Sequence, residues 1–143
     1  MLHKDILWDV IPASEKRRIL SQDECELDVG FLGFTEVYRS LSKIIPKHFT
    51  VIDFGCYLAA QCYCFGNHKK YVGVDIVDME RFSLQNTEHY VMSIQKFIKE
   101  HGSEHKKETT FAICSYVPDE DAVKMVRENY RNVFVYYPAK IEL

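Results

Sequence analysis

Short apolar segments alternate with amphipathic ones over most of the chain after residue 34. Five segments rich in β-branched and aromatic residues predict strands, at 49–54, 71–76, 89–92, 110–115 and 133–137. Before and between them, apolar positions recur at helical spacing and predict helices at 35–45, 58–65, 93–101 and 119–130. Because the strands are largely apolar on both faces, the pattern favours a mainly parallel sheet that helices cover on both sides.

Residues 1–34 do not follow this alternation and are predicted to form an N-terminal extension. One stretch within it, 13–20, has helical character. A polar connection with some helical character is expected at 78–86, and a charged surface loop at 104–108. We therefore expect a single domain, in which residues 35–137 form a three-layer α/β sandwich.

The composition of the 143 residues is that of a globular protein, with 47% hydrophobic and 27% charged residues. No apolar run approaches the roughly 20 residues of a membrane-spanning helix, so no membrane span is expected. The first ten residues lack the apolar segment and cleavage site of a secretory signal. Five cysteines without such a signal predict reduced thiols and a cytoplasmic protein.

Net charge and cysteine spacing argue against two further function classes, nucleic-acid binding and metal binding. A net charge of −3 gives no strong signal for nucleic-acid binding, which relies on a basic surface. Basic residues are dense only at 69–70 and 105–107, and we expect both runs to be solvated turns. Cys62 and Cys64 have no second pair of ligands at metal-binding spacing, so no metal site is predicted.

The predicted topology directs attention to the residues that follow each strand, because ligands of open α/β sheets bind at the carboxyl ends of the strands. Asp53 and Gly55 come at the end of the first strand, and Asp75 ends the second, about twenty residues after Gly55. An acidic residue at that spacing can accept hydrogen bonds from two adjacent ribose hydroxyls. The alternative is that these residues form a turn and a helix cap.

Two segments carry a resemblance to a known family. Residues 51–56 (VIDFGC) and 71–76 (YVGVDI) resemble the class I S-adenosylmethionine-dependent methyltransferases, and 111–119 (FAICSYVPD) is similar to their fourth motif. The resemblance covers residues 35–137 and implies S-adenosylmethionine as cofactor, held at its methionine end by the first motif, at its ribose by the acidic residue and at its adenine after the third strand. The implied cofactor-binding residues are Asp53, Gly55, Cys56, Tyr57, Asp75, Ile76, Ser93, Ile94 and Ser115.

The chain also departs from the family pattern. Tyr57 and Ala59 stand where the family usually has further glycines, and Ser93 stands where an acidic residue is common. An Asn-Pro-Pro-Tyr motif is not found after the fourth strand, where 115–118 reads Ser-Tyr-Val-Pro. Because little sequence follows the fifth strand, we expect a five-stranded sheet of order 3-2-1-4-5 without the family's strands 6 and 7.

Two functions remain open at this point. The first is a small methyltransferase with an unknown acceptor, small molecule or macromolecule, for which no catalytic residue is assigned. The second is a non-catalytic, degenerate Rossmann-like module that binds a nucleoside-type ligand or a protein partner. The fifth strand is apolar and lies at a predicted sheet edge, so both a homodimer through this edge and cover by residues 1–31 are open.

Overall fold

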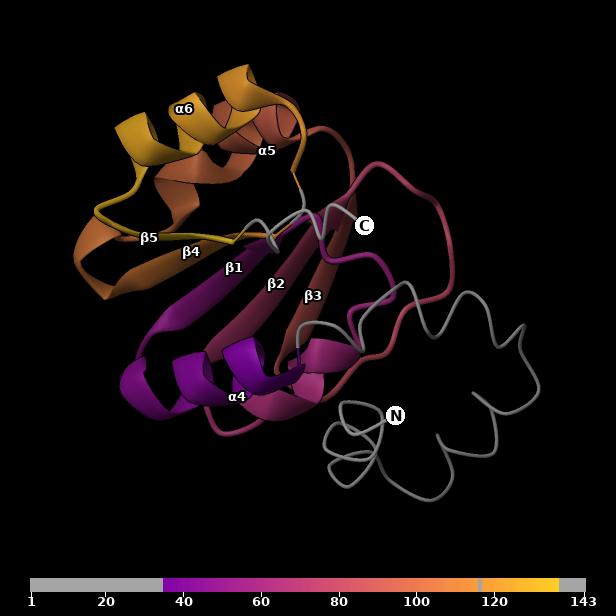
Figure 1. Ribbon diagram of the computed structural model, residues 1–143, viewed down its shortest axis with the longest axis vertical. Helices are drawn as coiled ribbons and strands as arrows, with labels where there is room; N and C mark the ends of the chain where they lie inside the picture. Colours follow the sequence, from indigo (N-terminus) through magenta and orange to yellow (C-terminus); the bar gives the residue numbers. More distant parts are fainter. Residues whose placement is uncertain (1–34, 116, 137–143) are drawn as a thin grey trace, which may run out of the picture.

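A five-stranded parallel sheet forms the centre of the protein (Figure 1). The computed structural model describes residues 35–115 and 117–136. The strands run in the order β3-β2-β1-β4-β5, and every neighbouring pair is parallel. This confirms the predicted fold class and strand order. The strands are β1 (Thr50–Phe54), β2 (Lys70–Asp75), β3 (Thr87–Val91), β4 (Thr110–Ser115) and β5 (Asn132–Tyr136).

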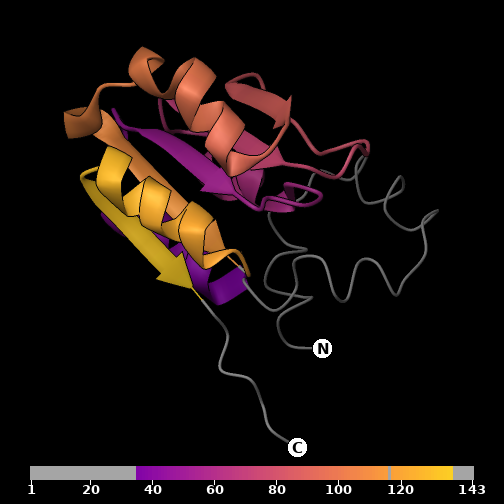
Figure 2. The same cartoon turned by 90° about the horizontal axis from the view of Figure 1, so that it is seen from above.

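Helices cover both faces of the sheet, which gives the three layers (Figures 1 and 2). One face packs against α4 (Thr35–Ile44) and the 3₁₀ helix η2 (Ala60–Phe65). The other packs against α5 (Ile94–His101) and α6 (Glu120–Asn129). Two short 3₁₀ turns, η3 (Gly102–Glu104) and η4 (Lys107–Thr109), connect α5 to β4.

Alternation along β1 divides the hydrophobic core into two clusters. Val51 lies in the cluster beneath α4 and η2, together with Tyr71 and Ile113 from the neighbouring strands. Ile52 and Phe54 lie in the cluster beneath α5 and α6. Successive strand residues point to opposite faces, so a central strand must be apolar at nearly every position. Asp53 is the charged residue of β1, and it falls on the α4 face.

Two connections differ from the helical character expected of them. Residues 58–65 form only the short 3₁₀ helix η2, which begins after Ala59 in a left-handed conformation. No helix forms between β2 and β3. There, tertiary contacts override local propensity: Phe82 is buried and its N–H donates to the Leu58 carbonyl, while Arg81 donates to several backbone carbonyls. The helix predicted at 13–20 lies outside the described residues.

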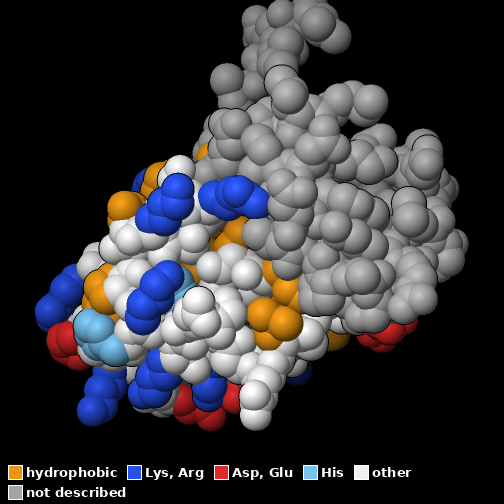
Figure 3. Space-filling view, turned by 90° about the horizontal axis from the view of Figure 1, so that it is seen from below, with side chains coloured by type: hydrophobic (Ala, Val, Ile, Leu, Met, Phe, Trp, Pro, Cys, Tyr) orange, Lys and Arg blue, Asp and Glu red, His pale blue; other side chains and the backbone are white. Residues whose placement is uncertain are grey.

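The outer surfaces add little to the functional picture. Figure 3 shows Lys and Arg side chains spread among uncharged and hydrophobic ones on the face seen from below. β5 lies at the edge of the sheet and pairs with β4, and its role in a homodimer stays a prediction. No helix in the described part of the chain is long and apolar enough to cross a membrane.

Candidate functional site

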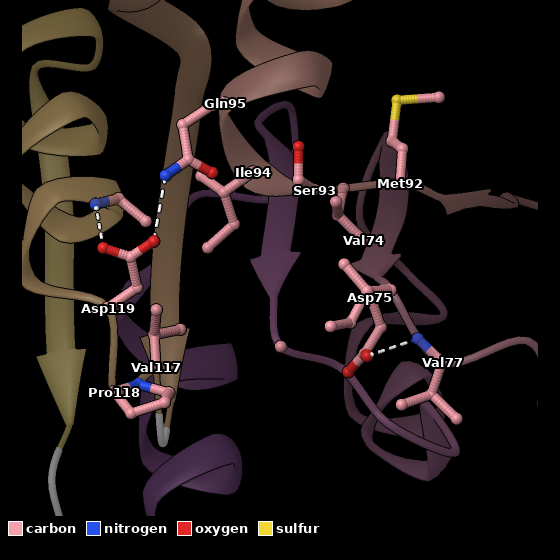
Figure 4. A pocket seen from close by; sticks show the side chains of 13 residues that line it. Val74, Asp75, Val77, Met92, Ser93, Ile94, Gln95, Val117, Pro118 and Asp119 are labelled. Carbon is pink, nitrogen blue, oxygen red and sulfur yellow. Dashed lines mark hydrogen bonds between the residues drawn. The ribbon is translucent and has the colours of Figure 1, made fainter.

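A pocket of about 400 Å³ opens at the carboxyl ends of the strands (Figure 4). It lies where β1 is flanked by β2 on one side and β4 on the other, so the connections leave the sheet in opposite directions. Ligands of open α/β sheets bind at such a topological switch point. The pocket is lined by Gly55, Val74, Asp75, Ile76, Val77, Met92, Ser93, Ile94, Gln95, Val117, Pro118, Asp119 and Ala122.

Asp75 places a carboxylate at the wall formed by the end of β2. Its Oδ2 accepts a hydrogen bond from the Tyr57 backbone N–H at 2.9 Å, and its Oδ1 accepts one from the Val77 N–H at 2.9 Å. The side chain is partly exposed. A carboxylate offers about four lone-pair sites, so each oxygen retains acceptor capacity for a ligand. The two backbone donors fix the plane of the carboxylate in advance.

Gly55 forms the part of the floor that belongs to the loop after β1. Its φ is +80°, a conformation that L side chains rarely adopt, and its N–H donates to the Val74 carbonyl at 2.8 Å. A Cβ at this position would lie 2.9 Å from the Ser115 carbonyl oxygen. The loop after β1 thus approaches β4 so closely that a side chain at this position does not fit.

Two helix N-termini close the opposite wall. Ser93 caps α5, with its Oγ accepting from the Lys96 N–H at 3.1 Å. Asp119 caps α6 through its Oδ1, and its Oδ2 accepts from Gln95 Nε2 at 3.0 Å. The hydrogen bond from Gln95, together with those from the backbone of α6, lowers the pKa of Asp119. Asp119 is therefore a carboxylate at neutral pH and a weak base.

The remaining walls are apolar. Residues of the loop after β2 form the rim of the pocket, and Ile76 there is 70% exposed. Side chains that follow β3 and β4 form the rest of the apolar wall. Figure 4 shows Met92, Ile94 and Val117 on separate elements around the opening. An apolar cleft with a few fixed polar groups is the usual character of a small-ligand site. The apolar lining residues are Val74, Ile76, Val77, Met92, Ile94, Val117, Pro118 and Ala122.

Asp53 does not line this pocket, although the family resemblance implies that it contacts the cofactor. It is fully buried beneath the loop and points toward α4. Its Oδ1 accepts from the Tyr38 hydroxyl at 2.8 Å, and its Oδ2 accepts from Gln61 Nε2 at 2.8 Å and from the Tyr71 hydroxyl. Burial raises the pKa of Asp53 to about 6, although these three donors oppose the shift.

Three further predicted positions also lie outside the pocket lining. Cys56 is buried in the α4-side core, where burial raises the pKa of its thiol. Ser115 is buried and hydrogen-bonded to the Tyr38 hydroxyl at 2.8 Å. The side chain of Tyr57 packs against the same core, and only its N–H reaches Asp75. All three side chains lie on the α4 face of the sheet.

Of the predicted residues, the structure brings Gly55, Asp75, Ile76, Ser93 and Ile94 together around the pocket. Sequence reasoning did not place Gln95 or Asp119 there. Asp119 does carry a signal, since an acidic residue before a run of helical periodicity marks a helix N-cap. Gln95 carries none, because its role depends on how α5 lies beside α6.

A second pocket, of about 390 Å³, lies at the other end of the sheet and gathers the two basic runs noted in the sequence. Lys69 and Lys106 are exposed there, whereas Lys70 pairs with Glu88 at 2.9 Å. The lining thus mixes both signs of charge. Within the described residues, no group of three or more His, Cys, Asp or Glu side chains could hold a metal ion.

Comparison with known proteins supports the fold. No family model matches the chain, and no curated protein matches it. Among solved structures, it is similar to SMU.1697c of Streptococcus mutans, a provisionally assigned methyltransferase crystallised in complex with SAH (S-adenosylhomocysteine). The TM-score is 0.50 at 20% identity, and the match covers 71% of each chain. The chain therefore has a methyltransferase-like fold.

Proposed function

We propose that the protein binds S-adenosylmethionine in the pocket at the carboxyl ends of β1, β2 and β4. The observation that carries the proposal is the carboxylate of Asp75, which two backbone N–H groups hold at the pocket wall with acceptor capacity to spare. Two adjacent ribose hydroxyls are donors of matching geometry for such a group. The similarity to a fold that was crystallised with SAH supports the same assignment.

The other lining residues fit the rest of this cofactor. Gly55 exposes backbone without a side chain, and a Cβ there would be too close to Ser115, so the loop suits close approach of the methionine portion. Met92, Ile94 and Val117 offer apolar surface to the flat adenine ring. Bound S-adenosylmethionine supplies a methyl group made electrophilic by the adjacent sulfonium charge.

Methyl transfer to an acceptor is the function that we propose for this site, and it would rest on positioning. Among the described lining residues, Asp119 is a weak base because its pKa is lowered, and the lining contains no cysteine. Displacement at a sulfonium methyl requires chiefly that the acceptor atom be held in line, and well-oriented reactions gain about 7–11 kcal/mol in this way. The chain's residues would bind, orient and exclude water.

The weak basicity of Asp119 also favours a second candidate function, a non-catalytic module that binds the nucleoside and transfers no methyl group. The described lining contains no His, Lys, Cys or Tyr side chain, so an acceptor that needs deprotonation would find no such base there. Incubating the protein with labelled S-adenosylmethionine and candidate acceptor pools separates the two. Label transfer supports the enzyme, whereas tight binding without transfer supports the module.

Asp75→Ala is expected to weaken SAH binding by roughly 10–100-fold, because the ribose loses its acceptor and a charge-assisted hydrogen bond contributes about 1.5–3 kcal/mol. Isothermal titration calorimetry with SAH measures the change. Asp78→Ala is the matched control, since Asp78 is an exposed acid three residues further on that does not line the pocket. An Asp75→Ala protein that is folded by far-UV circular dichroism and binds as well as wild type would show that the ribose is misplaced.

Tyr57→Gly is expected to change SAH affinity by less than about threefold, because the ring packs against the α4-side core and not in the pocket. Stability should respond more. The left-handed φ of 51° at Tyr57 would be relieved, by about 1–2 kcal/mol, while the packing of the ring is lost. Titration calorimetry and urea unfolding report the two effects separately. A tenfold change in affinity would mean that the ring contacts the ligand.

A further inference from the structure

Arg81 is a buried cation that donates hydrogen bonds to backbone carbonyls. It comes from the connection between β2 and β3 and is 8% exposed. Among the described residues, no Asp or Glu forms an ion pair with it. A buried charge is costly unless its polar atoms are satisfied. Its Nε has no hydrogen-bond partner among the described residues, so the partners of its two Nη groups indicate what its position requires.

Four backbone carbonyls accept hydrogen bonds from the guanidinium of Arg81. Nη1 donates to Gly73 at 3.2 Å and to Tyr90 at 3.1 Å, which links β2 to β3. Nη2 donates to Asp75 at 3.1 Å and to Val77 at 3.3 Å, on either side of Ile76. The carbonyls of the second pair belong to the turn that forms one wall of the pocket.

These contacts bear directly on the carboxylate of Asp75. The turn that Arg81 holds from one side contains the Val77 N–H, which donates to Asp75 Oδ1. The carboxylate in turn receives the Tyr57 N–H and so ties this turn to the loop after β1. If residues 75–77 shifted, the carboxylate would lose both donors and its direction. A planar guanidinium with five donors can span two pairs of carbonyls, whereas the three donors of an ammonium group on a flexible stem cannot hold the same geometry.

We propose that Arg81 is a positioning residue of the pocket: it fixes residues 75–77 so that the carboxylate of Asp75 faces the ligand. The part of this inference that concerns ligand affinity rests on the proposed function. The part that concerns the orientation of Asp75 does not, because the Tyr57 and Val77 amides report on it in the ligand-free protein.

Hydrogen exchange of the ligand-free protein, read residue by residue by NMR, tests the orientation. In Arg81→Lys, exchange of the Tyr57 and Val77 amides should accelerate by at least about tenfold relative to amides of β4 and β5, as in a local opening. Leu41→Ala is the matched control. It removes a buried side chain of α4 that does not line the pocket, and it should lower stability without selective exchange at these two amides.

A double-mutant cycle with SAH tests whether Arg81 acts through Asp75. Arg81→Lys should bind SAH about tenfold more weakly than wild type, and Arg81→Gln more weakly still. The double variant Asp75→Ala, Arg81→Lys should bind no more weakly than Asp75→Ala alone, because the carboxylate to be positioned is already absent. Leu41→Ala, measured at a temperature where it is fully folded, should bind as wild type does.

The outcomes separate the two ideas. If wild type does not bind SAH but the Tyr57 and Val77 amides still exchange faster in Arg81→Lys, the proposed function fails and the positioning role stands. If these amides are unchanged, or if the two affinity losses simply add, the positioning role is overturned. It is also overturned if neither Arg81→Lys nor Arg81→Gln keeps the far-UV spectrum of the fold, since Arg81 would then support the whole domain.

Discussion

Gly55→Ala is expected to lower the free energy of unfolding by about 2–4 kcal/mol, a large part of the stability of a small domain. Two effects combine at this residue. Its φ of +80° is unfavourable for any residue with a Cβ. The new Cβ would also lie 2.9 Å from the Ser115 carbonyl oxygen, which is backbone of β4 and cannot move without disturbing the sheet. Urea unfolding measures the loss.

Gly102→Ala serves as the control for this substitution. Gly102 follows α5 with a φ of −58°, and a Cβ there would meet Ile98 at 3.5 Å, an ordinary contact. Alanine should therefore be neutral or stabilise by up to about 1 kcal/mol through the unfolded state. Similar stability losses in the two variants would contradict the special role of Gly55. Because Gly55 lines the pocket, its variant should also bind SAH more weakly, whereas Gly102→Ala should not.

The sheet could be predicted because β1, β2 and β4 are buried at nearly every position and so appear as short, largely apolar runs. The two helices beside the pocket could be predicted from their amphipathic pattern, and Ser93 and Asp119, the first positions of the predicted helices, are their N-caps. Gly55 and Asp75 could be placed at the pocket because they end neighbouring parallel strands. These are local signals combined with one topological rule.

The role of Asp53 could not be predicted, because being near the carboxyl end of a strand does not tell which face a side chain takes. Asp53 shares the α4 face with Val51, and its partners Tyr38 and Tyr71 come from α4 and β2. Their hydroxyls are brought together by packing and not by sequence spacing. Cys56, Tyr57 and Ser115 have the same origin: each looks like a loop residue near the site but directs its side chain into that core.

Arg81 gave no usable signal either. An arginine in a polar connection is normally a solvated surface residue, and the carbonyls that it binds become neighbours only after β2 and β3 pair. The irregular course of residues 78–86 has the same cause, since Arg81 and Phe82 gain tertiary contacts that a helix would not allow. Contacts between residues that are distant in the sequence determine these features, and the local pattern of apolar and polar residues does not indicate them.

The contribution of Asp53 to the free energy of unfolding is expected to fall as pH rises from about 4 to about 7. Its pKa in the folded protein is about 6, above the 3.8 of an unperturbed carboxyl. The folded state therefore holds a proton that the unfolded state releases at lower pH. This stabilisation is fully present below pH 3.8 and is lost as pH passes through 6. A shift of this size corresponds to about 3 kcal/mol.

Asp53→Asn isolates this contribution, because its unfolding free energy should lack the fall that Asp53 causes. The amide fits the network: its oxygen can accept from Tyr71 and Gln61, and its nitrogen can donate to the Tyr38 hydroxyl, which then donates to Ser115. Urea unfolding of both proteins between about pH 4 and about pH 8, a range that contains this window, gives the difference curve. Tyr71→Phe should displace the fall to higher pH, since the Tyr71 hydroxyl lowers the pKa of Asp53. Parallel curves for wild type and Asp53→Asn would mean that burial leaves this carboxyl ionised throughout.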